Sequence, residues 1–419
     1  METNIILYYI MLFFYKLLIL FIVILFTYLL FRLVSKRKQL LSPPLEGMNA
    51  SKSKSNDGPE SDDGPESKSK ESFTDPETSE LDSFKKVTEG PGVRSVDILD
   101  AYLPLREYAI KASYNSAVTG KYVSLDAIKH VISRGARFLD FEVYMIDNNL
   151  YVAQSNDASY KTIDSDNKIL LDDVLSTTVI SGFTAPCPNP EDPLFIQLRI
   201  KSANTEIYKK VAMSIDNNLK HKLYRDASGK IAQVDPNVTM LSDIMGKVIM
   251  VIDKIVAPEY DIAPSCPPPV EKSKLCANPE NKKSPLCNIE ETPCYNLTKY
   301  ANMISGSESL FTYSFESLLK QTTSPVNIND DKKTTDVTKM KIALPDIDNS
   351  NVGNPDAEPL IRDHGVQIIC YRFYKKDANF TKYEKLFKDA ELGIVPLAKI
   401  VYILQISVLD RSPNPPKLF

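Results

Sequence analysis

The hydrophobic and polar positions divide the chain into three stretches with different patterns. Residues 5–31 form an apolar run that only Lys16 interrupts, whereas residues 51–72 are nearly free of apolar side chains and contain DGPES twice. From about residue 97, continuous apolar runs alternate with segments whose apolar residues recur at a spacing near 3.6. Such runs are typical of buried strands, and such spacing is typical of helices that pack on one face. The sequence therefore predicts an apolar N-terminal helix, a polar linker and an α/β domain.

Strand-like runs follow one another closely in the α/β region. They occupy residues 136–146, 149–154, 193–201, 246–253, 309–315 and 365–373. Residues 123–135 are typical of the helical segments between them and end in a glycine. Alternating strands and helices favour a mainly parallel sheet, and six to eight such units in roughly 300 residues fit a distorted TIM-type (β/α)8 barrel. A doubly wound sheet is the rival fold, but no glycine-rich phosphate loop supports it.

The apolar run of residues 5–31 is long enough to be a membrane anchor. A helix needs about 20 apolar residues to span a bilayer, and a cleaved signal peptide has a shorter apolar core followed by small residues. Arg32 and the basic segment 36–38 follow the run, so the positive-inside rule places its C-terminal side in the cytoplasm. We predict that residues 1–41 form a single-pass transmembrane anchor with its basic flank, and that the globular part is cytoplasmic. A buried core helix is the alternative interpretation.

The other boundaries follow from composition. Residues 42–96 are predicted to be a disordered linker rich in Ser, Lys, Asp and Pro, because so few apolar side chains cannot offset the entropy of ordering. An insertion rich in Pro and Cys, residues 258–295, separates a first half of the domain (97–257) from a second half (296–400). Residues 401–419 are predicted to be a C-terminal tail.

Cysteine usage and net charge exclude some classes of function. Four of the six cysteines lie in the insertion: Cys266, Cys276, Cys287 and Cys294. No pair of them has the C-x₂-C spacing of a zinc site, and a cytoplasmic domain keeps thiols reduced. The net charge is −4, and no basic stripe with interleaved aromatic residues indicates nucleic-acid binding.

Several segments in order resemble a known family. The first group is KASYNSAVTG (111–120), SLDAIKHVISRGARFLDFEVY (124–144), NLYVAQS (149–155), LLDDVLSTTV (170–179) and PLFIQLRIK (193–201). It resembles the X region of phosphoinositide-specific phospholipase C. The second group, KIALPDIDNSNVGNP (341–355), RDHGVQIICYRF (362–373) and GIVPL (393–397), resembles the Y region of that family. The resemblance covers about residues 97–400, puts the insertion at the family's X/Y linker, and implies a β/α barrel of the phospholipase C-like phosphodiesterase type.

The resemblance implies that the catalytic acid and base are missing. The family's reaction attacks phosphorus with the inositol 2-hydroxyl and uses two histidines and Ca²⁺. Tyr114 stands at the first histidine position and Gln154 at the second. A phenol titrates near pH 10 and an amide does not titrate. For the three histidines of the chain, His130, His221 and His364, packing or surface roles are expected, with His364 the one whose loop can reach a pocket.

The resemblance also implies a partly retained metal site. Asn115, Asp140 and Glu142 match the family's Asn and two acidic calcium ligands, but Arg199 replaces the fourth, acidic ligand. Asp140 and Glu142 are two residues apart in a strand, so both face the same side. We therefore expect an internal salt bridge from Arg199 to Asp140, Glu142 or both, and favour no cofactor, with Ca²⁺ as the alternative and two solvated acids as a third possibility.

The headgroup-binding positions are mixed. Ser314 and Lys341 match positions that hold phosphate in the family, whereas the two basic positions of its fifth strand are Val251 and Asp253 here. The leading hypothesis is a membrane-anchored, catalytically impaired phospholipase C-like protein with a binding or scaffolding role, binding a phosphoinositide or another anion at the barrel mouth. Two alternatives remain open: an active phosphodiesterase that uses Tyr114 or His364, and a purely structural membrane protein.

Overall fold

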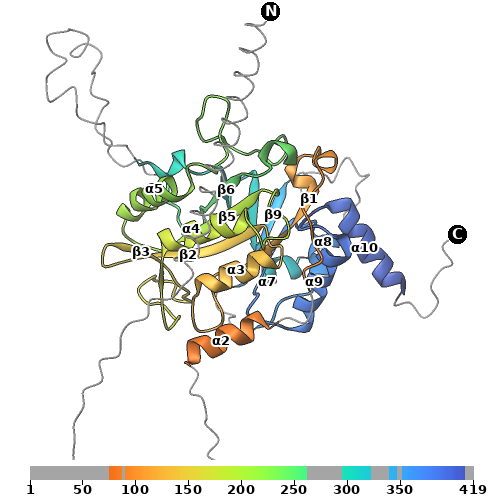
Figure 1. Ribbon diagram of the computed structural model, residues 1–419, viewed down its shortest axis with the longest axis horizontal. Coiled ribbons are helices and arrows are strands. Elements are labelled where there is room, and N and C mark those ends of the chain that lie inside the picture. The colour runs from red at the N-terminus through yellow and green to blue at the C-terminus, as the bar shows by residue number, and fades with distance from the viewer. Residues whose placement is uncertain (1–74, 87–89, 262–294, 322–338, 347–351, 411–419) are drawn as a thin grey trace, which may run out of the picture. The chain divides into compact units, whose positions relative to one another are not determined.

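The computed structural model describes residues 75–86, 90–261, 295–321, 339–346 and 352–410, which all belong to one compact unit (Figure 1). The predicted anchor, most of the predicted linker and the four cysteines of the insertion lie outside the described residues. Within those ranges, no helix has both the length and the apolar character needed to cross a bilayer.

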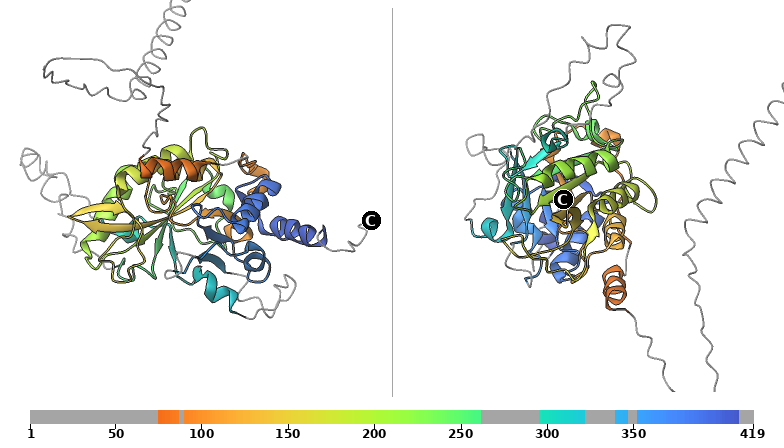
Figure 2. Two further views of the ribbon diagram at one scale, coloured as in Figure 1. Left: turned by 90° about the horizontal axis from the view of Figure 1, so that it is seen from below. Right: turned by 90° about the vertical axis from the view of Figure 1, so that its left-hand side faces the viewer.

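Eight parallel strands form a nearly closed barrel. They follow chain order around it, and each is hydrogen-bonded to its neighbours except that β7 and β8 are in contact without a ladder between their described residues. The barrel strands are β1 (Tyr108–Ser113), β2 (Phe138–Ile146), β5 (Leu194–Ile200), β6 (Val248–Asp253), β7 (Met303–Ser305), β8 (Leu310–Ser314), β9 (Met340–Leu344) and β10 (Ile368–Tyr371). Helices surround these strands (Figure 2). The predicted TIM-type barrel is confirmed, and the doubly wound sheet is excluded.

Helices cover the outside of the barrel. They are α2 (Pro76–Lys85), α3 (Leu125–Ser133), α4 (Leu171–Gly182), α5 (Glu206–Leu219), α7 (Phe315–Leu319), α8 (Ala357–Arg362), α9 (Ala378–Ala390) and α10 (Leu397–Asp410). In α3 the Ser124 side chain accepts a hydrogen bond from the Asp126 backbone N–H, which caps the N-terminus. Gly135 follows with φ +82°, a conformation that favours glycine, and a Cβ there would lie 2.3 Å from Val93 Cγ2. Capping and the glycine turn together set the length of α3.

Three further strands extend the barrel sheet. β3 (Asn149–Val152) pairs antiparallel with β2, and β4 (Ile169–Leu170) pairs with β3. At the N-terminal end of β1, β11 (Ile394–Pro396) pairs antiparallel with Tyr108–Ile110. β1 therefore has contacts with β2, β10 and β11.

The barrel interior changes from apolar to polar along the strands. Neighbouring residues in register form an apolar layer of Ala112, Phe138, Phe195 and Ile249. Two residues further along β2 and β5, Asp140 is paired with Gln197, and two residues beyond those Glu142 is paired with Arg199. Since side chains alternate along a strand, all of these face the interior. The polar layers lie at the C-terminal ends of the strands, which we call the barrel mouth.

Helices extend into two segments that the sequence assigns to a linker and a tail. Helix α2 lies within residues 42–96, which were predicted to be a disordered linker, and the Glu80 carboxylate accepts hydrogen bonds from Thr119 Oγ1, Lys121 N and Tyr122 N. These long-range contacts order a segment whose own apolar content is low. At the other end, α10 continues past residue 400 to Asp410, into the predicted C-terminal tail.

Candidate functional site

Tyr114 and Asn115 follow β1 directly and lie at the barrel mouth. The Tyr114 backbone N–H donates to the Tyr371 carbonyl at 2.9 Å, which continues the pairing of β1 with β10. Asn115 then takes φ +42°, a left-handed conformation that asparagine tolerates better than most residues. This turn directs the Asn115 N–H to Asp140 Oδ2 at 3.1 Å and its Nδ2 to Glu142 Oε1 at 3.3 Å. The first-strand loop therefore contacts both acidic residues of β2.

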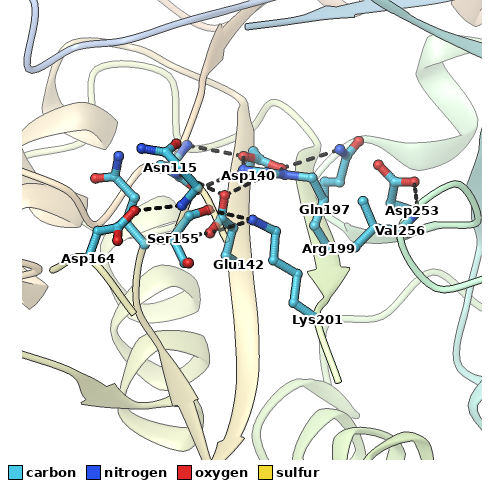
Figure 3. A network of polar contacts seen from close by, with 12 residues as sticks. Asn115, Asp140, Glu142, Ser155, Asp164, Gln197, Arg199, Lys201, Asp253 and Val256 are labelled. Carbon is cyan, nitrogen blue, oxygen red and sulfur yellow. Dashed lines mark hydrogen bonds and ion pairs between the residues drawn. The ribbon is translucent and has the colours of Figure 1, made fainter. Parts of the chain in front are cut away.

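Arg199 lies between the two carboxylates (Figure 3). Its Nε donates to Asp140 Oδ1 at 2.8 Å, one terminal nitrogen donates to Asp140 Oδ2 at 2.7 Å, and the other donates to Glu142 Oε1 at 2.8 Å. The nitrogen that contacts Asp140 Oδ2 also donates to Asn115 Oδ1 at 2.7 Å. Asp140, Glu142 and Arg199 are all buried. The predicted salt bridge of Arg199 is confirmed, and it includes both Asp140 and Glu142.

A second cation completes the network. Lys201 Nζ lies 3.0 Å from Glu142 Oε2 and donates to the Ser155 carbonyl at 2.8 Å. Glu142 Oε2 also accepts from Tyr144 Oη at 2.7 Å and from Ser155 N at 2.9 Å. Lys201 and Tyr144 are not among the site residues predicted from the sequence. Strand alternation was the available signal, because they are two residues beyond Arg199 and Glu142 on the same strand faces.

The electrostatics of the network follow from burial and pairing. Burial alone raises the pKa of Glu142, but Arg199, Lys201 and the hydrogen bonds from Tyr144 and Ser155 outweigh it and lower the pKa to about 2. Burial acts to lower the pKa of Arg199, but Asp140, Tyr114 and Glu142 hold that pKa well above its usual value. Both groups are therefore charged at neutral pH.

The donor set around the carboxylates fits a guanidinium better than a divalent cation. Each of the four carboxylate oxygens of Asp140 and Glu142 accepts from at least two donors, Gln197 Nε2 being the second on Asp140 Oδ1 at 3.3 Å. Calcium requires six to eight oxygen ligands with free lone pairs. No group of three or more His, Cys, Asp or Glu side chains suited to a metal occurs in the described part of the chain.

The two degenerate catalytic positions lie at the mouth. The Tyr114 ring is buried and packs against Arg199, with 4.5 Å from the guanidinium carbon to the ring centroid. Burial raises the pKa of the Tyr114 phenol well above its usual value, and Arg199 offsets only part of this. Gln154 precedes Ser155, whose N–H contacts Glu142, and the Gln154 carbonyl accepts from Asp164 N at 2.7 Å. Neither position supplies a group that exchanges protons near pH 7.

Asp253 adds a third carboxylate at the mouth. It pairs in register with Ser305 at the end of β6 and is buried. Its Oδ1 accepts from Ile255 N at 2.7 Å and Val256 N at 3.1 Å. Burial nevertheless raises the pKa of Asp253. Val251, the neighbouring inward position, contributes no charge.

The structure contradicts the expectation that Lys341 binds phosphate at the mouth. Ile342 of β9 is opposite Ile368 of β10, which is opposite Ile110 of β1, so Lys341 lies near the N-terminal ends of these strands. Its Nζ donates to the His364 carbonyl at 2.8 Å, in the loop before β10. Lys341 therefore belongs to the opposite end of the barrel. The motif around Lys341 indicates its strand but not how far along the barrel axis the residue lies.

Ser314 lies at the C-terminal end of β8 but has a local role. Its side chain accepts from Ser317 N at 3.1 Å and caps α7. This contact is compatible with the mouth position and gives Ser314 a structural role as the N-cap of α7.

All three histidines lie away from the mouth. His130 is on α3, and His221 follows α5. His364 is buried at the N-terminal end of β10, where its carbonyl accepts from Lys341. The hypothesis that His364 serves as an acid or base at the mouth is therefore wrong.

Comparisons with known proteins find one family model and several solved structures that are similar to this chain. Residues 102–254 match the family model described as phosphatidylinositol-specific phospholipase C, X domain. The crystal structure of L. pealei PLC21 has a TM-score of 0.50 and 14% identity, covering 72% of this chain and 38% of that chain. S. officinalis PLC21 has a TM-score of 0.49 and 13% identity, covering 72% and 38%. The calcium-dependent phosphoinositol-specific phospholipase C from Pseudomonas sp. has a TM-score of 0.41 and 13% identity, covering 74% and 100%.

The chain spans about 38% of the length of each PLC21 chain. At such identities, the structural likeness shows the fold alone. No curated protein sequence matches the chain.

Proposed function

The chain has the phospholipase C-like phosphodiesterase fold and contains an X-domain segment, and we propose that its catalytic centre is disabled. We further propose that the protein has a binding or scaffolding role at a membrane. The observation that carries this proposal is the position of Arg199. Its guanidinium is bonded to both acidic residues and to Asn115, the three positions that correspond to the family's calcium ligands.

The chemistry of the mouth supports the loss of catalysis. Cleavage of a phosphodiester by an internal hydroxyl needs a base and an acid near that hydroxyl and the leaving group. Each lost acid or base typically costs about 10²–10⁴ in rate. Tyr114 and Gln154 cannot replace histidine at neutral pH, and no histidine of the chain lies at the mouth.

Arg199 is also poorly placed to stabilise a transition state. A guanidinium has five N–H donors, and Arg199 uses four of them on Asp140, Glu142 and Asn115. One N–H remains for a ligand. The positive charge of Arg199 neutralises protein carboxylates rather than a phosphate, and no divalent cation is needed at the site.

The experiment compares turnover with metal binding in the full-length chain. We expect wild-type protein in detergent–lipid micelles to release inositol phosphate from phosphatidylinositol at background rate, with or without Ca²⁺. Arg199→Glu creates a site with four oxygen-bearing side chains, and we expect this variant to bind Ca²⁺ measurably in calorimetry while wild type does not. The matched control is Arg362→Glu, which changes charge equally at a surface position.

Two results would overturn the proposal. One is robust hydrolysis by wild type that Tyr114→Phe abolishes, which would establish the active alternative. The other is stoichiometric Ca²⁺ binding by wild type, which would show that Arg199 leaves the carboxylates. Absence of turnover together with retention of the protein on membranes supports the scaffolding role.

A further inference from the structure

An exposed apolar surface lies at the N-terminal end of the barrel, opposite the mouth. Segment 97–107 leads into β1 and segment 235–243 precedes β6, and both lie within the described range 90–261. In Figure 1, the orange turn beside the label of β1 lies across the molecule from β3, which pairs with the C-terminal half of β2. The two segments carry six large apolar side chains that are 36–77% exposed: Ile98, Leu99, Tyr102, Leu103, Val238 and Met240. We call these two segments the basal surface.

Backbone hydrogen bonds join the two segments into one surface. The Leu105 N–H donates to the Thr239 carbonyl at 2.9 Å. In the other direction, the Leu241 N–H donates to the Leu103 carbonyl at 3.1 Å. The Leu103 N–H in turn donates to Tyr108 Oη at 3.2 Å, and the Tyr108 side chain is buried. The exposed side chains are therefore held on an ordered backbone, which limits the entropy that is lost when a partner binds.

The exposed side chains are not part of the core. The same two segments supply other apolar side chains to the core, among them Ala101, Leu105 and Leu241, which are fully buried. Single exposed apolar residues are ordinary on a protein surface, whereas a contiguous group of them marks an interaction site. The six exposed side chains are thus available to a partner without any unfolding of the barrel.

The basal surface is also acidic. Its two segments contain five acidic residues and one basic residue, a net charge of −4: Asp97, Asp100, Glu107, Asp235, Asp243 and Arg106. The Arg106 Nε lies 3.1 Å from Glu107 Oε1, so the basic residue has a carboxylate partner within the surface itself. The four aspartates are exposed, and none of them is in an ion pair with another residue that the structure describes.

This negative charge distinguishes among the possible occupants. The cytoplasmic leaflet of a membrane is negatively charged, so the four aspartates oppose contact with it. A second copy of the chain in a two-fold contact would present the same acidic surface, and like charges across an interface repel each other. A protein segment that carries apolar side chains flanked by Lys or Arg complements both the apolar and the acidic character of the surface.

We propose that the basal surface binds a basic amphipathic segment of a partner protein. A helix whose apolar stripe covers the exposed side chains and whose Lys or Arg residues pair with the aspartates meets both requirements. The inference names the kind of partner for the proposed scaffolding role and rests on that role. Because the basal surface lies at the opposite end of the barrel from the mouth, the partner leaves the mouth open.

The test uses full-length protein in phosphatidylcholine nanodiscs and two labelled peptides. One peptide is an amphipathic Leu/Lys helix about four turns long, and the other has Glu in place of every Lys. Fluorescence anisotropy measures binding at several salt concentrations, with empty nanodiscs as the background. The apolar variant is Leu99→Ser/Val238→Ser, and the charge variant is Asp97→Asn/Asp100→Asn.

Each variant has a matched control outside the basal surface. Ile180→Ser/Met213→Ser removes two exposed apolar side chains from α4 and α5. Asp147→Asn/Asp173→Asn removes two exposed negative charges. All of the substituted side chains are exposed, so we expect all four variants to keep the unfolding midpoint of wild type, and the midpoints are measured alongside binding.

We expect wild type to bind the Leu/Lys peptide with an affinity that falls as salt rises, and to bind the Leu/Glu peptide at background. The apolar variant should bind the Leu/Lys peptide about tenfold more weakly, because it removes contacts from the centre of the surface. The charge variant should bind about fivefold more weakly and with a smaller dependence on salt. The controls should stay close to wild type. No saturable binding by wild type, equal binding of the two peptides, or equal weakening by the controls would overturn the proposal.

Cross-linking identifies the occupant directly. A photoreactive phenylalanine analogue replaces Leu99, and the protein is illuminated in vesicles that contain anionic lipid, with the Leu/Lys peptide present. A cross-link to the peptide supports the proposal, whereas a cross-link to lipid or to a second copy of the chain overturns it. These readouts involve neither turnover nor Ca²⁺, so failure here and failure of the proposed loss of catalysis are distinguishable.

Discussion

At the scale of single residues, the removal of Arg199 should destabilise the domain strongly. Its removal leaves two buried carboxylates, Asp140 and Glu142, without their main counter-ion. Removing one partner of a buried ion pair typically costs about 3–5 kcal/mol of stability. We therefore expect Arg199→Ala to lower the free energy of unfolding by about that amount in urea titrations.

The control for Arg199→Ala is a surface arginine in a similar number of ion pairs. Arg362 is 41% exposed at its side chain and pairs with Glu358 and Asp363. Exposed pairs contribute about 0–1 kcal/mol, so Arg362→Ala should have a small effect. Equal destabilisation by the two variants would show that the Arg199 pairs do not stabilise the barrel.

His130 gives the domain a predictable dependence on pH. In the unfolded chain a histidine binds a proton below about pH 6.5, whereas burial and the cations around His130 lower its pKa to about 4 in the folded domain. The unfolded state therefore binds more protons between these values, and stability falls as the pH decreases from about 6.5 to 4. Above pH 6.5 this contribution is constant.

The measurement compares the free energy of unfolding of wild type and His130→Gln across that pH range. We expect the difference between the two proteins to change between pH 6.5 and 4 and to be flat above pH 6.5. The comparison removes the opposite effect of Asp192, whose pKa burial raises to about 6. Parallel profiles throughout would contradict the assignment to His130.

At the scale of elements, substitution of Lys341 tests whether β9 places this residue at the N-terminal end of the barrel. Because its Nζ bonds the His364 carbonyl at the N-terminal end of the barrel, Lys341→Met should lower the free energy of unfolding by about 1–3 kcal/mol, the loss of a charge-assisted hydrogen bond. It should leave binding of any anion at the mouth unchanged. A selective loss of such binding, with stability retained, would restore the mouth assignment of Lys341.

The sequence predicts which residues form strands better than it predicts how far along the barrel axis each residue lies. Parallel strands buried on both faces have continuous apolar runs, which is why 193–201 and 246–253 correspond to β5 and β6. The alternation of side-chain directions along β2 and β5 then predicts that Asp140, Glu142 and Arg199 all face the barrel interior. Lys341 was misplaced because a motif gives the strand but not the register with its neighbours.

Helix α2 could not be predicted from the sequence because tertiary contacts order it. The segment of α2 is polar, and only Phe84 is buried among its residues. Its helix is held by contacts with residues far along the chain, such as Lys85 with Asp126 at 2.7 Å. A pattern of hydrophobic positions contains no signal for such contacts.

At the scale of the whole molecule, we propose that residues 1–41 anchor the barrel on the cytoplasmic face of a membrane. The basic residues after the apolar run motivate this orientation. In sealed vesicles with the cytoplasmic face outward, added protease should digest the domain, and a variant lacking residues 1–41 should no longer sediment with membranes. A domain protected inside the vesicles, or glycans on Asn237 and Asn296, would show the opposite topology.

The position of β1 has a consequence for the protein during its synthesis. Ile110 in β1 is opposite Ile368 in β10 and Ile394 in β11. At translation rates of about 5–20 residues per second, β1 emerges from the ribosome tens of seconds before these partners do. For that time, one edge of a buried strand has no neighbour, and unpaired edges of this kind promote aggregation. Nascent chains stalled before β10 should therefore remain bound to chaperones, whereas chains stalled beyond β11 should be released as protease-resistant domains.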